Sequence, residues 1–127
     1  MPAKVVDTSV LAALVFGEEQ AAEALGLIEG FELYAPILLS YELTSVARKK
    51  SFQYPTQREA IAIALELGLA MNLTWVDVDL PDVLAAALSS GLTTYDATYL
   101  NLARSMAVPL VTFDKRLVAA HAHDIAD

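Results

Sequence analysis

Four carboxylates stand apart from the other acids of this chain because of their positions in the sequence. Asp7 and Asp114 each come directly after an apolar run that is typical of a buried strand. Glu42 and Asp96 have mostly apolar neighbours three and four residues away, as expected on the inward stripe of a helix. Carboxylates are rarely buried unless they are paired or bound to a metal. These four residues are therefore the first candidates for chemistry.

An ordinary structural role stays open for each acid taken alone. Asp7 and Asp114 could simply cap the helices that are predicted to follow them. Glu42 and Asp96 could instead form ion pairs with a nearby basic residue, for which the sequence offers Arg48, Arg104 and Lys115.

Convergence of all four acids would require a counter-charge. Two carboxylates about 4 Å apart repel by roughly 4 kcal/mol at an effective dielectric of 20. An all-oxygen set of ligands suits Mg²⁺ or Mn²⁺, the ions that assist phosphodiester hydrolysis. Zinc is disfavoured because the chain has no cysteine, and its two histidines, His121 and His123, point apart on a helix. We expect both histidines on the surface.

Short apolar runs alternate with helical patterns along the chain. The predicted strands are Ala3–Val6, Phe31–Ala35, Leu73–Val78 and Val108–Phe113. The predicted helices run through Phe16, then over Glu18–Glu29, Pro36–Lys50, Thr56–Met71, Pro81–Ser90 and Tyr95–Met106, with a last one from Lys115. This alternation predicts a single α/β domain over residues 1–127, a three-layer α/β/α sandwich with a short parallel sheet of four to five strands. Ligands of such sheets bind beyond the carboxyl ends of the strands, where the strand order reverses.

Composition narrows the class of protein. Apolar residues make up 56% of the 127 residues and charged residues 19%, which excludes a disordered chain. No apolar run approaches the length of a membrane span, and nothing resembles a targeting segment, so we expect a cytoplasmic protein with no membrane partner. The net charge of -8 argues against broad electrostatic binding of nucleic acid. The apolar excess favours a surface for self-association or for a protein partner.

The acids and their surroundings resemble the motifs of a known family. The sequence is similar to the PIN-domain nucleases, and among them to the VapC-type ribonuclease toxins of prokaryotic toxin–antitoxin pairs. The resemblance covers essentially the whole chain and is carried by Val5-Val6-Asp7-Thr8-Ser9-Val10, by Tyr41-Glu42-Leu43, by Thr94-Tyr95-Asp96-Ala97-Thr98-Tyr99 and by Val111-Thr112-Phe113-Asp114-Lys115-Arg116-Leu117.

The resemblance implies a metal-dependent endoribonuclease that hydrolyses phosphodiester bonds in RNA. It implies that the acidic quartet Asp7, Glu42, Asp96 and Asp114 is catalytic and surrounds Mg²⁺ or Mn²⁺. The small hydroxyl positions of the motifs are Thr8, Ser9 and Thr112, which are expected to hydrogen-bond to the ligands. The family also implies a cognate antitoxin protein and frequent homodimerisation.

Basic residues for RNA or antitoxin contact are few. Lys115 and Arg116 flank Asp114 and are the strongest candidates, and Arg104 is expected near the acids as well. The remaining cluster, 48–50, is interpreted as a complement to the dipole at the end of its helix.

Three other classes of protein share some of these features. A phosphoacceptor receiver domain has a similar length and an acidic Mg²⁺ site, but it should show paired acids after the first strand, where Asp7 stands alone. A phosphatase of the haloacid dehalogenase type should have a second Asp where Ser9 stands. A PIN fold kept only as a binding module would have no need of all four acids.

Overall fold

The computed structural model describes the backbone of residues 1–126 and the side chains of residues 1–122. Its strands are β1 (Ala3–Val6), β2 (Glu32–Pro36), β3 (Leu73–Val76) and β4 (Leu110–Val111). Its α-helices are α1 (Thr8–Val15), α2 (Ala21–Ile28), α3 (Leu38–Gln53), α4 (Arg58–Leu69), α5 (Leu80–Ser90), α6 (Thr94–Met106) and α7 (Lys115–Ala126), with a short 3₁₀ turn, η1 (Pro55–Gln57), before α4. None of the helices over the described residues is long and apolar enough to cross a membrane.

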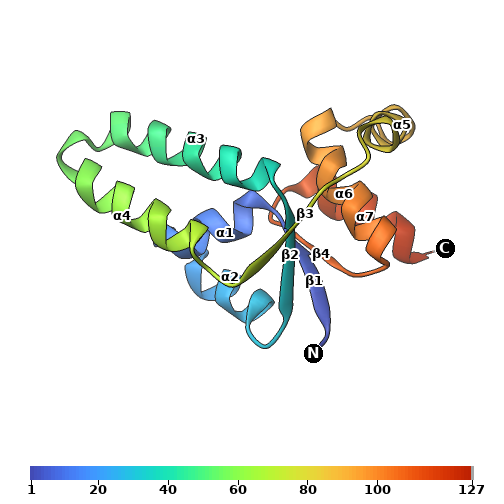
Figure 1. Ribbon diagram of the computed structural model, residues 1–127, viewed down its shortest axis with the longest axis horizontal. Coiled ribbons are helices and arrows are strands. Elements are labelled where there is room, and N and C mark those ends of the chain that lie inside the picture. Colours follow the sequence, from blue (N-terminus) through green and yellow to red (C-terminus); the bar gives the residue numbers. More distant parts are fainter. Residues whose placement is uncertain (127) are drawn as a thin grey trace.

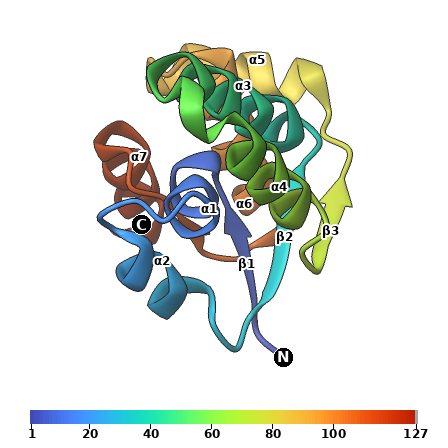
Figure 2. The same cartoon turned by 90° about the vertical axis from the view of Figure 1, so that its left-hand side faces the viewer.

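The sheet is parallel throughout and has the order β3-β2-β1-β4. Helices α1 to α4 lie on one side of the sheet and α5 to α7 on the other, as Figure 1 shows. The predicted three-layer α/β/α sandwich with a short parallel sheet is therefore confirmed. Helices α3 and α4 form an antiparallel pair that extends away from the sheet, and both views show this pair in green (Figures 1 and 2).

The position of β1 determines where a ligand can bind. The chain moves from β1 to β2 and β3 on one side, and then crosses to place β4 on the other side of β1. This reversal makes the carboxyl ends of β1 and β4 the switch point of the sheet. A receiver domain instead has its third strand beside the first, in the order 2-1-3-4-5. The observed order is thus not that of the receiver domain considered as the alternative.

Strand β4 is shorter than the sequence suggested. Val108 donates its N–H to the carbonyl of Ala103 and so belongs to the end of α6, and Pro109 has no N–H to donate. At the other end, the N–H of Phe113 donates to a side chain, Ser9 Oγ, instead of to a neighbouring strand. Both ends of the predicted strand 108–113 are therefore used for other contacts, and only Leu110 and Val111 pair with β1.

The core lies on both faces of β1, where Val5 and Val6 are fully buried. Leu39 and Leu43 of α3 are also fully buried, and so is Leu100 of α6. This packing fixes the first turns of α3 and α6 close to the end of β1. The fold therefore holds Glu42 and Asp96, which lie in those parts of the two helices, near the switch point.

Helix α4 packs closely on its neighbours at Gly68. A Cβ at this position would lie 2.8 Å from Cγ1 of Val15 and 3.2 Å from Cδ2 of Leu43. A Cβ at Gly26 of α2, in contrast, would have no atom of a neighbouring element within 4 Å. Both glycines lie in α-helices, but only Gly26 has space for a larger side chain.

We predict opposite effects of the Gly68→Ala and Gly26→Ala substitutions. Alanine in an open helical position stabilises by about 0.5–1 kcal/mol relative to glycine, and Gly26→Ala should show this gain. Gly68→Ala should lose it and destabilise by about 1–3 kcal/mol because the methyl group overpacks α1 and α3. Chemical denaturation of both variants measures the difference, and equal gains would contradict the close packing of α4.

Candidate active site

The register between β1 and β4 brings the first pair of site residues together. Val6 pairs with Val111, so the next residues along the chain, Asp7 and Thr112, lie side by side. The N–H of Asp7 donates to the carbonyl of Val111 at 3.2 Å, and Thr112 Oγ1 donates to Oδ2 of Asp7 at 2.6 Å. Asp7, the acid after β1, is thus hydrogen-bonded to residues at the end of β4, more than a hundred positions later in the sequence.

The carboxylate of Asp7 is buried, and both of its oxygens accept hydrogen bonds. Only 5% of the residue is exposed. Its Oδ1 accepts from the backbone N–H and the Oγ of Ser9, at 3.0 and 2.6 Å, and from the N–H of Val10 at 3.4 Å. Burial raises the pKa of Asp7, and the hydrogen bonds from Ser9, Thr112 and Val10 oppose that rise. Asp7 is therefore the N-cap of α1 and at the same time a carboxylate held in one orientation.

Glu42 has two hydroxyl donors from other elements. Its Oε1 accepts from Thr8 Oγ1 at 3.1 Å and also from the hydroxyl of Tyr99. Thr8 and Tyr99 lie 2.8 Å apart at their oxygens, so the three side chains form one network. Burial raises the pKa of Tyr99 far above its usual range, and Glu42 adds to the rise. The phenol therefore stays protonated and can act as a hydrogen-bond donor to Glu42.

Asp96 and Asp114 form a second pair of acids near the switch point. The pKa of Asp96 is raised, first by burial and then by the negative charge of Asp114, whereas Thr93 and Arg116 lower it. Asp114 Oδ1 accepts from the backbone N–H groups of Arg116 and Leu117, at 2.8 and 3.2 Å, and so caps α7. Thr112 Oγ1 accepts the N–H of Asp114 at 2.9 Å and links this pair to Asp7.

The alternative ion pairs of Glu42 and Asp96 are not formed. Over the residues that the structure describes, the ion pair present is Lys50 with Glu18, at 3.4 Å. The positive charge of Arg116 lowers the pKa of Asp96, although no ion pair joins the two side chains. The helix-capping roles that Asp7 and Asp114 could have are both present.

The basic residues that were expected near the acids divide into two groups. Lys115 and Arg116 begin α7, next to Asp114, and both are exposed. Arg104 lies eight residues beyond Asp96 on α6, about 12 Å along the helix axis. There it lines a cavity with Ser89, Ser90 and Ala120. The structure therefore does not bring Arg104 to the four acids.

His121 has a structural contact that the sequence did not suggest. Its Nε2 accepts the backbone N–H of Leu110 at 3.2 Å, and the side chain is partly buried. The expectation that it is a free surface residue is wrong, because the helix that follows β4 folds back over that strand. The side chain of His123 lies outside the described residues.

The donor set fits a hard divalent cation in its chemistry. It consists of carboxylates, and in the described chain neither Oε2 of Glu42 nor Oδ2 of Asp114 accepts a hydrogen bond. The mutual charge of Asp96 and Asp114 also favours a cation between the elements that carry them. As the side chains stand, no three Asp, Glu or His residues of the described part are arranged around one point. Binding of an ion would therefore require carboxylates to turn toward it.

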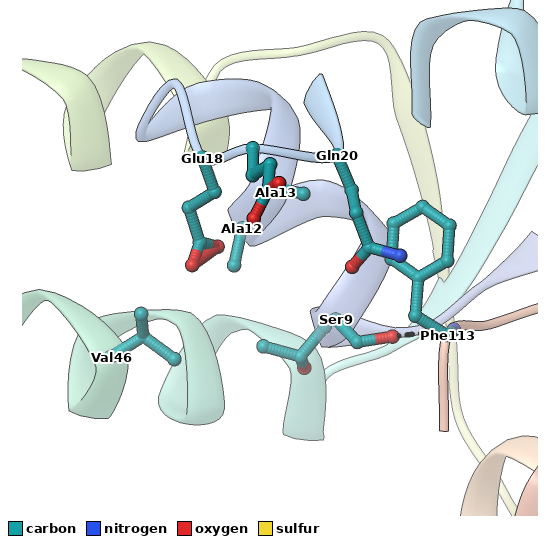
Figure 3. A pocket seen from close by; sticks show the side chains of 9 residues that line it. Ser9, Ala12, Ala13, Glu18, Gln20, Val46 and Phe113 are labelled. Carbon is teal, nitrogen blue, oxygen red and sulfur yellow. Dashed lines mark hydrogen bonds between the residues drawn. The ribbon is translucent and has the colours of Figure 1, made fainter. Parts of the chain in front are cut away.

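A cavity of about 550 Å³ opens beside the acids, next to Thr8 and Ser9. Ala12 and Ala13 of α1 and Val46 of α3 give it an apolar lining, and Figure 3 shows Glu18 and Gln20 extending over it from the turn after α1. Phe113 lies at the end opposite Val46, where Ser9 Oγ accepts its N–H at 2.9 Å (Figure 3).

Sequence reasoning missed the role of Tyr99 and the location of Arg48 and Lys49. Tyr99 lies three residues after Asp96, and this spacing could have indicated a shared helix face. Arg48 and Lys49 were interpreted as a complement to the helix dipole, yet both line a second cavity together with Thr8 and Glu42. The spacing of seven residues between Glu42 and Lys49 is a signal for a common face.

We predict that Thr112→Val lowers the free energy of unfolding by about 1–2 kcal/mol, because both Asp7 Oδ2 and the N–H of Asp114 lose a hydrogen-bond partner. Thr74→Val, at an exposed position of β3, is the matched control and should change it by less than about 0.5 kcal/mol. Urea denaturation of both variants makes the comparison. Equal effects would show that the Thr112 hydroxyl does not support the site.

We predict that Asp96→Asn raises the melting temperature of the metal-free protein by about 1–4 °C at neutral pH. The native pKa of Asp96 lies above its ordinary value of 3.8, so its ionised form destabilises the fold. The destabilisation by ionised Asp96 is absent below about pH 3.8 and grows as the pH rises through the native pKa. The increase in melting temperature of Asp96→Asn should therefore vanish in acid.

Asp82→Asn is the control for Asp96→Asn. Both acids lie three residues after an N-cap whose side chain accepts their N–H, Asp79 for Asp82 and Thr93 for Asp96. Asp82 is exposed and should show no gain in melting temperature. Calorimetric scans in EDTA measure both, and a gain for Asp82→Asn as large as that for Asp96→Asn would attribute the effect to the helix end alone.

Comparison with known proteins identifies the family to which this chain belongs. The model of the PIN domain family matches residues 4–122. A curated relative, ribonuclease VapC3 from Pyrobaculum aerophilum, is 30% identical over an alignment of 118 residues that covers 89% of this chain and 90% of the relative. The residues matched by the family model include Asp7, Glu42, Asp96 and Asp114.

Solved structures show the same fold. The crystal structure of PAE2754 from Pyrobaculum aerophilum has a TM-score of 0.75 and 28% identity, over 93% of this chain and 78% of that one. VapC20 from Mycobacterium tuberculosis, described as a sarcin-ricin loop cleaving toxin, has a TM-score of 0.67 and 19% identity, over 93% and 95%. A toxin-antitoxin complex from Klebsiella pneumoniae has a TM-score of 0.63 and 19% identity, over 88% and 87%. This chain belongs to the PIN domain family and, within it, is of the VapC type.

Proposed function

We propose that this protein is a metal-dependent endoribonuclease, the toxin of a type II toxin–antitoxin pair, which hydrolyses phosphodiester bonds in RNA. The observation that carries the proposal is the linkage of the acids near the switch point of a PIN domain. Thr112 bridges Asp7 and Asp114, the charge of Asp114 acts on Asp96, and Glu42 is bonded to Thr8, the residue after Asp7. In the described structure these acids have no cationic ion-pair partner. The curated relative named ribonuclease VapC3 supports the same activity.

The four acids are proposed to hold Mg²⁺ or Mn²⁺. A bound divalent ion would neutralise developing charge on the phosphate and lower the pKa of attacking water. Asp7 and Asp96 are proposed as the principal ligands, and Glu42 and Asp114 would hold metal-bound waters or a second ion. The proposal is supported by the carboxylate chemistry of the site and by the family, whose members generally use divalent ions.

The remaining site residues hold the carboxylates in place. Ser9 and Thr112 donate to Asp7 and leave it little freedom to rotate. Thr8 and Tyr99 do the same for Glu42 through Oε1, and Oε2 accepts no hydrogen bond within the described residues. Such hydrogen bonds typically account for a factor of ten to a hundred in metal affinity or activity. We propose that Lys115 and Arg116, beside Asp114, contact the RNA or the antitoxin.

A basic antitoxin and a second copy of this chain are the proposed protein partners. The net charge of -8 favours a positively charged partner. The similar fold of the toxin-antitoxin complex from Klebsiella pneumoniae supports a toxin–antitoxin arrangement. Leu80, Leu84 and Leu88 are exposed on one face of α5 and supply an apolar surface suited to homodimerisation. An RNA substrate implies action in the cytoplasm.

The test is cleavage of RNA by the purified protein, freed of any partner, with Mg²⁺, with Mn²⁺ and with EDTA. We expect cleavage with either ion and none with EDTA. Asp7→Asn and Asp96→Asn should each reduce the rate on the order of 100-fold or more, because the site loses a ligand charge. Asp82→Asn should cut at the wild-type rate. Cleavage in EDTA, or full activity of Asp96→Asn, would be incompatible with the proposed site.

A second arm tests the toxin role in cells. Expression of the wild-type chain alone should arrest growth, and co-expression of the open reading frame beside its gene should restore growth. Asp96→Asn expressed alone should not arrest growth. Arrest by Asp96→Asn as strong as that by the wild type would show that RNA cleavage is not its cause.

A further inference from the structure

Adjacent lysines near the end of α3 have different environments. Nζ of Lys50 lies 3.4 Å from Oε2 of Glu18 and 5.7 Å from the centre of the Phe16 ring. Lys49 lies instead in the wall of a cavity of about 390 Å³ that it shares with Glu42. In the part of the chain that the structure describes, Lys49 has no ion-pair partner. The charge of Lys50 is therefore neutralised locally, whereas that of Lys49 is available to a ligand.

This cavity connects the acidic site with the basic end of α3. It is lined by Thr8, Glu42, Ser45, Val46, Arg48 and Lys49. Glu42 and Lys49 are seven residues apart, which is about 10 Å along the helix axis. Helix α3 begins at the sheet and extends away from it (Figure 1), so the cavity is acidic at its inner end and basic at its outer end.

Arg48 is held at the cavity by an aromatic side chain. Its guanidinium carbon lies 4.9 Å from the centre of the Phe52 ring, and that of Arg58 lies 5.5 Å from the same ring. A guanidinium stacked on a ring keeps its N–H donors directed outward in the plane of the group. The outer end of the cavity thus combines a restrained guanidinium with a free ammonium, which are the two side chains that bind phosphate oxygens.

The charges around the acids restrict where a polyanion can lie. The larger cavity, which shares Thr8 and Val46 with this one, is also lined by Glu19. Glu19 has no ion pair within the described residues, and its carboxylate repels phosphate. On the α7 side of the acids, Arg116 lies close enough to Asp96 for its positive charge to lower the pKa of Asp96. Positive charge is therefore available on both sides of the acids, at Arg48 and Lys49 on α3 and at Arg116 on α7.

We propose that the cavity lined by Arg48 and Lys49 is a phosphate subsite, which holds the RNA backbone beside the phosphodiester bond to be cut. This inference rests on the proposed RNA cleavage and adds a subsite for a neighbouring nucleotide. The RNA strand would cross the four acids from α3 to α7, with a phosphate held at each end. Because the subsite contacts a phosphate other than the reacting one, it contributes to substrate affinity and not to the chemical step.

The experiment compares Lys49→Gln with Lys50→Gln, which remove the same charge from neighbouring positions of one helix. Cleavage of a randomised single-stranded RNA pool is measured as a function of RNA and salt concentration. Lys49→Gln should raise KM about three- to tenfold with kcat unchanged, and should reduce the salt dependence of KM by about 0.7 in log–log slope, the loss of one phosphate contact. Lys50→Gln should leave both quantities at wild-type values, and Lys49→Arg should restore KM.

Binding of the same labelled RNA pool in EDTA separates this inference from the proposed function. If the wild type cuts RNA and Lys49→Gln has the KM and salt slope of Lys50→Gln, the subsite is wrong and the nuclease stands. If RNA binds in a manner that depends on Lys49 but neither ion supports cleavage, the nuclease is wrong, and the cavity is a phosphate site for RNA binding without cleavage. If Lys49→Gln weakens binding of polyglutamate but not of RNA, the cavity receives an acidic protein segment and the proposal is overturned.

Discussion

The buried carboxylate of Asp7 is the interaction on which the rest of the site depends. It accepts hydrogen bonds from the first turn of α1 and from Thr112 beyond β4, and so joins residues that are more than a hundred positions apart in sequence. Burial without these donors would cost several kcal/mol and would favour a neutral acid. The donors from α1 are local, but the donor from Thr112 requires the parallel pairing of β1 with β4, so this hydrogen bond joins the site to the sheet.

The concentration of negative charge follows from the order of the strands. Placing β4 beside β1 puts two strand-end acids at one edge, and α3 and α6 add an acid each from the two helical layers. The raised pKa of Asp96 records the cost of this arrangement, since its second cause is the charge of Asp114. The net charge of -8 is therefore a poor guide to the partner by itself. Within the described residues these four acids form no ion pair, whereas Glu18 is paired with Lys50, and this difference is more informative than the net charge.

Much of the fold could be predicted from the sequence because the central elements have strong local signals. Ala3–Val6 is predicted and observed with the same bounds, since a short apolar run ends there at a helix cap. The strand order could not be predicted, because it depends on contacts between distant strands. The limits of β4 were missed for a related reason: Val108 and Phe113 are apolar enough for a strand, but their N–H groups bind Ala103 and Ser9.

The site shows the same division between local and long-range signals. The four acids could be selected because each breaks a local pattern, whereas Tyr99 fits its apolar helix face and gives no sign that its hydroxyl reaches Glu42. Lys49 and Lys50 can be distinguished by sequence only through their spacing from Glu42, seven and eight residues, and only if Glu42 is already known to face the site. Successive residues of a helix point about 100° apart, and which of them faces the site depends on how α3 packs against α1.

Helix capping and the proposed metal binding do not compete for these acids. Asp114 caps α7 through Oδ1 and Glu42 is held through Oε1, so the structural contacts use one oxygen of each of these two carboxylates. Asp7 uses Oδ1 for the cap, and its Oδ2 accepts only from Thr112 among the described residues. The capping bonds also neutralise part of the charge before any ion arrives, because helix N-termini carry positive partial charge. An acid that served only as a cap would be satisfied by this contact alone. Glu42 and Asp96 cap no helix, and Asp7 and Glu42 accept from hydroxyls of other elements. The four acids therefore exceed what the caps require, and this excess is the physical reason for proposing that they do chemistry.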